Sequence, residues 1–112
     1  MNLDMLATEL HRTSVEKGFW EPLKRMDKQD SFIFYAKQIA MIQSEATEVL
    51  EALRKSKDQR EVVDELADII IRTLDLWAGL DEAGVTTTSL YTALLMKADT
   101  NKNRPKLHGV KG

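Results

Sequence analysis

The sequence contains no cysteine, which excludes disulfide bonds, thiolate zinc sites and cysteine nucleophiles and suits a reducing compartment. Only two histidines are present, His11 and His108, and because they lie at opposite ends of the chain we expect no histidine-rich metal site. No apolar run approaches the roughly 20 residues of a membrane span, and no N-terminal stretch has the order of a signal peptide. The sequence therefore predicts a cytoplasmic protein without a membrane partner.

Glycine and proline are also scarce, with 5 glycines and 2 prolines among 112 residues. No segment alternates apolar and polar residues as a half-buried strand does, and no internal repeat or low-complexity segment is present. Apolar residues recur instead at spacings of three and four, which is typical of amphipathic helices. The sequence thus predicts an all-α protein, and its length allows one domain with one modest core.

The apolar stripes, together with residues that favour helix ends, predict four helices. The first half of the chain contains a helix over 3–17 ended by Gly18, a turn at 19–22, a loop at 23–30, and a helix from its cap Asp30 or Ser31 to Leu53. The second half contains a helix capped by Asp58 with Gly79 and Gly84 around its end, and a helix within 86–103 capped by Thr87 or Thr88. We expect residues 1–104 to form the domain and residues 105–112 a basic tail.

Charge is distributed unevenly along the chain. Residues 1–96 carry 11 basic and 17 acidic residues, a net charge of −6, whereas residues 97–112 carry 5 basic and 1 acidic residue, a net charge of +4. The acidic body would repel a long polyanion, so we expect no nucleic-acid partner. The basic segment is either a solvated terminus or an arm that binds phosphate.

Two pairs of acidic residues flank the apolar stripes of the two long helices. Glu45 and Glu48 lie on one helix, and Glu65 and Asp68 lie on the next. Both pairs are equally far from the turn near residue 56, so an antiparallel hairpin brings them to the same level. Four carboxylates so close repel one another, and a hard divalent cation such as Mg²⁺ or Mn²⁺ is the simplest compensation.

Two other interpretations of these acids are possible. They are surface residues that form salt bridges with Arg54, Arg60 or Arg72, or they belong to a di-iron centre. A di-iron bundle needs a Glu-x-x-His pair on two helices. Neither acidic pair contains a histidine, so only the salt-bridge alternative remains beside the cation site.

The last predicted helix carries a second group of polar residues. Lys97, Asn101 and Arg104 are spaced i, i+4 and i+7 and therefore share one helical face. Such a row can bind a polyphosphate, because one arginine guanidinium donates two parallel hydrogen bonds to two oxygens of a phosphate. The alternative is an ordinary helix C-terminus, where basic residues interact favourably with the helix dipole.

These motifs resemble the MazG-like all-α nucleoside triphosphate pyrophosphatases, whose signature is ExxE, a variable gap, and ExxD. The matching segments are Lys17-Gly18-Phe19-Trp20, residues 44–54, residues 64–72, and the row Lys97…Asn101…Arg104-Pro105…His108-Gly109. The similarity runs in order along nearly the whole chain. Ser44 is a departure, because many members carry a further acid before ExxE.

The resemblance implies a four-helix MazG-like bundle that cleaves a nucleoside triphosphate, or its deoxy form, to a monophosphate and pyrophosphate. It implies Mg²⁺ held by Glu45, Glu48, Glu65 and Asp68. Either Glu48 or Glu45 accepts a proton from the attacking water, since a general base needs an oxygen that is not committed to the metal.

The residues that we expect to contact the substrate are Lys97 and Arg104 on the triphosphate, Asn101 for orientation, Arg54 or Lys55 from the neighbouring helix end, and Trp20. Trp20 either stacks on the base or fills a hydrophobic gap under the first loop, and Asp75 supports the metal ligands or pairs with Arg72.

Four thin helices leave apolar surface uncovered, so we expect a homodimer or tetramer. A non-catalytic helical interaction module of the same fold is the alternative function.

Overall fold

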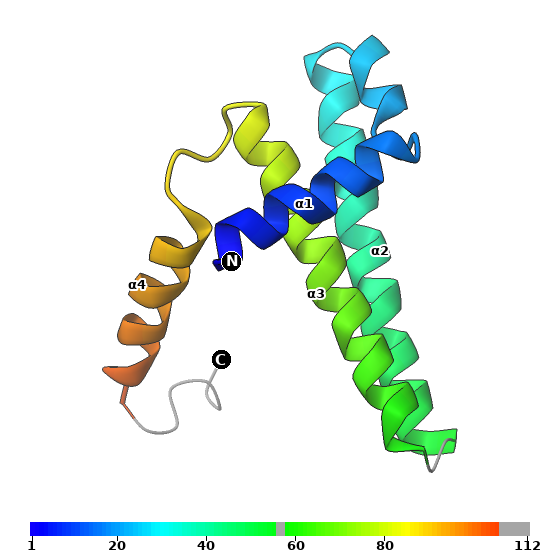
Figure 1. Ribbon diagram of the computed structural model, residues 1–112, viewed down its shortest axis with the longest axis vertical. Coiled ribbons are helices and arrows are strands. Elements are labelled where there is room, and N and C mark those ends of the chain that lie inside the picture. The colour runs from blue at the N-terminus through cyan, green and yellow to red at the C-terminus, as the bar shows by residue number, and fades with distance from the viewer. Residues whose placement is uncertain (56–57, 106–112) are drawn as a thin grey trace.

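The computed structural model describes residues 1–55 and 58–105 of the chain. Within these ranges every regular element is helical, which confirms the all-α prediction (Figure 1). The elements are α1 (Leu3–Glu16), the 3-10 helix η1 (Glu21–Arg25), α2 (Lys28–Lys55), α3 (Gln59–Glu82) and α4 (Leu90–Lys102). None of these helices is long and apolar enough to cross a membrane. The predicted tail, apart from Pro105, and His108 within it lie outside the described residues.

The long helices α2 and α3 lie side by side and antiparallel, as the hairpin prediction required, and α1 crosses them (Figure 1). The core lies where α1 packs on α3, and its buried residues are Ala7, Leu74 and Ala78. Small side chains at two of these positions let the helix backbones approach closely, and partly buried apolar neighbours complete the packing. These neighbours are Leu3, Leu10, Trp77 and Leu90.

The N-terminus of α2 differs from the prediction. The helix begins at Lys28 rather than after Asp30 or Ser31, because Asp27 caps it: Asp27 Oδ1 accepts the Asp30 N–H at 2.8 Å, and the Asp27 carbonyl accepts the Ser31 N–H at 2.9 Å. Of the loop predicted over 23–30, the helix η1 takes residues 23–25 and α2 takes residues 28–30. The loop prediction was wrong because polar residues with weak periodicity conceal short helical turns.

The ends of α3 and α4 also refine the prediction. Asp58 caps α3 as expected, with its Oδ1 accepting the Arg60 N–H at 2.9 Å. Gly84, in the left-handed conformation at φ +80°, follows the end of α3 at Glu82. Ser89, rather than Thr87 or Thr88, caps α4.

Gly79 and Gly84 lie on either side of the end of α3 at Glu82, as predicted, and the neighbouring indole explains why a glycine occupies position 79 inside the helix. A Cβ atom at this position would lie 2.2 Å from Trp20 Cη2, which is far inside van der Waals contact. Trp20 is 6% exposed and also packs against His11 and Phe34. Glycine at position 79 is less favourable for the helix than alanine would be, but its lack of a side chain leaves space for the indole ring.

We expect Gly79→Ala to destabilise the fold by about 1–3 kcal/mol, because the added methyl group overpacks the indole. Denaturant unfolding measures this free energy. At a helical position without such a neighbour the same change would stabilise the protein by up to about 1 kcal/mol. In a Trp20→Leu background the penalty should shrink, and an equal penalty in both backgrounds would contradict the assignment to the indole.

Helix α4 is attached to the rest of the chain near its start. Asp4 Oδ1 accepts the Leu90 N–H at 2.7 Å, while Asp4 Oδ2 accepts the Ser89 hydroxyl at 3.0 Å and the Tyr91 N–H at 3.2 Å. Partial desolvation opposes ionisation of Asp4, but these hydrogen bonds prevail and lower its pKa. Beyond this anchor α4 diverges from α2 and α3, and it has no buried residue (Figure 1).

Candidate functional site

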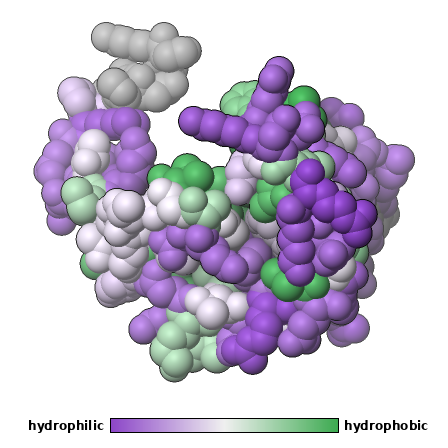
Figure 2. All heavy atoms as spheres, turned by 90° about the horizontal axis from the view of Figure 1, so that it is seen from above, coloured by the Kyte–Doolittle hydropathy of each residue, from purple (hydrophilic) through white to green (hydrophobic). Residues whose placement is uncertain are grey.

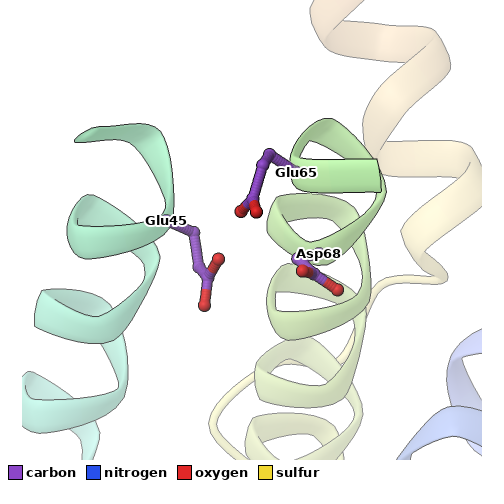
Figure 3. A group of neighbouring side chains, drawn as sticks. All are labelled: Glu45, Glu65 and Asp68. Atoms are coloured by element: carbon purple, nitrogen blue, oxygen red, sulfur yellow. The ribbon is translucent and has the colours of Figure 1, made fainter. Parts of the chain in front are cut away.

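Three of the four predicted acidic ligands converge between α2 and α3. Glu45 on α2, and Glu65 and Asp68 on α3, each offer a carboxylate oxygen, and these three oxygens lie within 4.8 Å of one another. Figure 3 shows Glu45 reaching from one helix toward the two acids of the other. The equal spacing of the two pairs from the turn explains this meeting, because the hairpin places residues 45 and 68 at similar heights.

Glu48, the fourth predicted ligand, is exposed and stands outside this group of three oxygens. It still acts on the site electrostatically. Partial desolvation, followed by the negative charges of neighbouring acids, raises the pKa of Glu65 above its ordinary value, and the charge of Glu48 is the largest of these Coulombic causes. The further acids that raise it are Asp68, Glu45 and Glu61. The group is thus a region of concentrated negative charge.

Arg72 is the cation that contacts this group. Its Nε donates to Glu45 Oε1 at 3.0 Å, which realises one of the three salt bridges considered in the alternative interpretation. Among the described residues, no ion pair involves Glu65 or Asp68, so most of the charge stays uncompensated. An ionised carboxylate has about four lone-pair sites, so the Arg72 bond leaves Glu45 able to bind a cation as well.

The donor set fits a hard divalent cation. Magnesium binds oxygen at roughly 2.1 Å, so oxygens on opposite sides of one ion stand roughly 4.2 Å apart. The three carboxylate oxygens, which all lie within 4.8 Å of one another, are close to such spacings. An all-oxygen site suits Mg²⁺ or Mn²⁺ and lacks the nitrogen and sulfur ligands that favour zinc or copper.

One pocket borders the acidic group, and a second pocket shares four lining residues with the first. The first, of about 290 Å³, is lined by Glu45 and Asp68 and also by Lys17. The second, of about 390 Å³, is mainly apolar, with Ile33, Phe34 and Met41 in its wall. Both pockets are lined by Ser14, Phe19, Arg72 and Asp75. The compartment that contains the carboxylates therefore adjoins an apolar compartment through these four shared residues.

A buried polar network behind these pockets was not foreseen in full. His11 Nδ1 lies 2.7 Å from Asp75 Oδ1, and the same oxygen accepts the Trp20 indole N–H at 3.0 Å. The indole also donates to Ser14 Oγ at 3.1 Å. Asp75 therefore pairs with His11 and Trp20 instead of Arg72. The H-x8-W spacing carries no local periodic signal, so only the fold links these residues.

Trp20 fills the interior, the second of the two roles considered for it. The structure leaves it 6% exposed, with its polar edge occupied by Asp75 and Ser14. Its neighbour Phe19 is 63% exposed and lines both pockets. Phe19 is thus the better-placed aromatic residue for contact with a ligand, and no feature of the sequence pattern favours it over Trp20.

The predicted phosphate-binding residues do not join the acidic group within this chain. Lys97 and Asn101 lie on α4, which diverges from the α2–α3 hairpin, and Arg104 lies beyond the end of α4 at Lys102 (Figure 1). The single helical face predicted for all three therefore extends only to Asn101. Arg54 is exposed in the last turn of α2, roughly 14 Å along the helix from Glu45 at 1.5 Å per residue.

Comparisons of the chain with models of protein families, with curated proteins and with solved structures find no match. The resemblance to the MazG-like family accordingly stays a prediction from the motifs. Function is therefore inferred from the sequence pattern and from the geometry of the acidic group.

Proposed function

We propose that this chain is a nucleoside triphosphate pyrophosphohydrolase of the MazG-like kind that depends on a divalent cation. The observation that supports the proposal most is the convergence of Glu45, Glu65 and Asp68 from two helices. Partial desolvation, and then the negative charges of the neighbouring acids, raise the pKa of Glu65 and so oppose its ionisation. Such an arrangement is typical of a site whose charge is balanced by a ligand.

In this proposal Glu45, Glu65 and Asp68 hold Mg²⁺, and Mn²⁺ is an acceptable substitute. When bound, the cation neutralises phosphate oxygens and orients the substrate. Glu45 keeps its bond to Arg72, which fixes the direction of its side chain. The Arg72 guanidinium also lines both pockets and can donate to a phosphate oxygen.

Glu48 is the best candidate for the general base. It lies one helical turn from Glu45, is exposed, and is not one of the three converging carboxylates. Its oxygens are therefore uncommitted, which a base requires. Hydrolysis adds one water across the α–β phosphoanhydride: the water oxygen bonds to phosphorus, the bridging P–O bond breaks, and Glu48 accepts the proton of the water.

The two pockets match the two parts of a nucleotide. The triphosphate fits the charged compartment, where Lys17 supplements Arg72. The nucleoside fits the apolar compartment of about 390 Å³, with Phe19 between the two. Ligand pockets commonly combine apolar walls with a few polar groups in this way.

The test is turnover of a panel of ribo- and deoxyribonucleoside triphosphates with Mg²⁺, followed by ³¹P NMR. We expect equal amounts of monophosphate and pyrophosphate, and no turnover after chelation of the metal. Glu51→Gln is a matched control, because Glu51 is an acid of α2 that pairs with Lys55 away from the site. Release of orthophosphate alone would contradict the bond assignment. Absence of both turnover and Mg²⁺ binding would favour a non-catalytic interaction module.

The proposal includes a homodimer or tetramer. Large apolar side chains of the α2–α3 hairpin are about half exposed or more, namely Leu50, Leu53, Val63, Leu66 and Ile70. Figure 2 shows hydrophobic residues reaching the surface at several places among hydrophilic ones. Association with further copies would remove this apolar area from water.

A further inference from the structure

Arg72 lies where the acidic group meets the two pockets. On α3 it follows Asp68 by one helical turn, so the two side chains leave the same face of the helix. Its Nε donates to Glu45 Oε1 at 3.0 Å, and the side chains of Arg72 and Glu45 are 36% and 18% exposed. Arg72 also lines both pockets. It is therefore a partly shielded cation fixed beside the proposed metal ligands.

Most donors of the Arg72 guanidinium stay available after this ion pair. A guanidinium has five N–H groups. Nε is used by Glu45, and Nη1 makes one long contact of 3.9 Å to Met41 Sδ. Within residues 1–55 and 58–105, Nη2 donates no hydrogen bond to another residue. The remaining N–H groups can therefore bind two oxygens of one phosphate, as arginine commonly does.

The charge of Arg72 has opposite consequences for a cation and for an anion. A divalent cation on Glu45 shares that carboxylate with the guanidinium, and like charges so close repel each other in a partly shielded site. A phosphate on the guanidinium lies beside the three converging carboxylates, which repel it in turn (Figure 3). Each ion alone therefore meets an opposing charge, whereas the two ions together compensate both charges.

We propose that Arg72 couples binding of the divalent cation to binding of the polyphosphate, so that the site selects their complex over either ion alone. Its charge weakens binding of a cation to the empty site. An anion on its free N–H groups neutralises that charge and removes the repulsion. Such coupling is reciprocal in binding free energy. The inference rests on the proposed function for the identity of the anion, the triphosphate of a nucleotide, but the coupling is measurable by binding alone.

The affinity for Mn²⁺ alone, without any nucleotide, tests the sign of the effect. We expect Arg72→Gln to bind Mn²⁺ roughly 5-fold more tightly than the wild type, or better, because the positive charge beside Glu45 is gone. Arg72→Lys keeps the charge and should keep the weaker affinity of the wild type. Electron paramagnetic resonance of free Mn²⁺ measures all three proteins. If Arg72 served only to orient Glu45, Arg72→Gln would bind Mn²⁺ more weakly, and the inference would be wrong.

A second measurement uses inorganic pyrophosphate as the probe anion. Calorimetry gives the pyrophosphate affinity of each protein without Mg²⁺ and at one fixed concentration of free Mg²⁺. The ratio of these affinities should be roughly 5-fold smaller in Arg72→Gln than in the wild type, or smaller still. Binding of Mg²⁺ to pyrophosphate in solution is the same for both proteins and cancels from the comparison. An equal ratio in the two proteins would overturn the coupling.

Arg60→Gln is the matched control. Arg60 lies in the first turn of α3, roughly 18 Å along the helix from Arg72 at 1.5 Å per residue, and lines neither pocket. Its replacement removes the same charge and should leave both measurements nearly unchanged. Tighter Mn²⁺ binding by Arg60→Gln, equal to that of Arg72→Gln, would assign the effect to net charge and overturn the inference.

The same measurements separate this inference from the proposed function. Nucleotide turnover by the wild type, together with weaker Mn²⁺ binding by Arg72→Gln, would overturn the role of Arg72 and leave the pyrophosphohydrolase standing. Tighter Mn²⁺ binding by Arg72→Gln and a smaller coupling, without turnover of any nucleotide, would support the role of Arg72 and contradict the proposed reaction. Absence of Mn²⁺ binding in every variant would overturn both.

Discussion

Replacement of Asp68 with alanine is expected to lower turnover by about 100-fold or more while the helical circular-dichroism signal stays unchanged. Asp68 is exposed and forms none of the ion pairs among the described residues, so its loss removes no packing or hydrogen bond that holds the fold. Its carboxylate is nevertheless one of the three that converge. Turnover number and Mg²⁺ affinity, measured on the same preparation, test this expectation.

The matched control is Asp64→Ala, an exposed acid one turn earlier on α3 that lies outside the converging group. It should keep nearly full activity. Glu48→Ala should also lower turnover strongly but leave Mg²⁺ affinity largely intact, as the loss of a base does. Full activity in Asp68→Ala, or unfolding of it, would remove the basis for the cation site.

Glu65→Gln is expected to raise the thermal stability of the metal-free protein and to abolish its stabilisation by Mg²⁺. Partial desolvation and the charges of Glu48, Asp68 and Glu45 raise the pKa of Glu65 above its ordinary 4.5. An acid with a raised folded-state pKa favours folding below its unfolded pKa, and this contribution is lost as pH rises through the folded value. The neutral amide removes the repulsion that remains at neutral pH.

The wild type should therefore show two opposite trends between pH 4 and pH 8. Without metal, the contribution of Glu65 to stability falls as pH rises past its raised pKa. With Mg²⁺, the free energy of unfolding rises with pH, because the metal binds the ionised carboxylate. A free Mg²⁺ concentration of about 100 times the dissociation constant adds about 2.7 kcal/mol. Glu65→Gln should show neither trend. Thermal melts with and without Mg²⁺ measure both.

Glu61→Gln is the control for this second prediction. Glu61 is an exposed acid in the first turn of α3 and contributes least among the charges that act on Glu65. Its replacement should change the melting temperature little and keep the response to Mg²⁺. If Glu65→Gln lowered the stability of the metal-free protein, Glu65 would be a structural residue instead of a ligand.

Local and periodic features made much of the fold predictable. The stripes of α2 and α3 recur over several turns, so the helices and their antiparallel pairing followed from spacing alone. The proximity of Glu45 to Glu65 and Asp68 followed too. In an antiparallel hairpin, residues that are equally many positions from the turn lie at the same height along the helix axes. Glu48 was predicted as a fourth ligand but lies outside the converging group. The count of residues from the turn gives the height of a residue along its helix but not the direction of its flexible side chain.

Helix boundaries were less predictable. The sequence predicted Asp30 or Ser31 and Thr87 or Thr88 as caps, whereas the structure uses Asp27 and Ser89, which are polar residues one to four positions away. The choice depends on the angle at which the chain enters the helix, which packing sets. The helix η1 was missed for a different reason, because its polar residues show no clear helical period.

By itself the sequence determined an all-helical chain, a central hairpin and a concentration of acids at one level of that hairpin, because each depends on spacing within one or two adjacent helices. Tertiary structure alone decided that Asp75 joins His11 and Trp20, that Gly79 makes room for the indole, and that α4 stands apart from the acids. These features join residues that are far apart in the chain. Their distances depend on how helices cross, and helix crossing is set by the fit of side chains that have no common period.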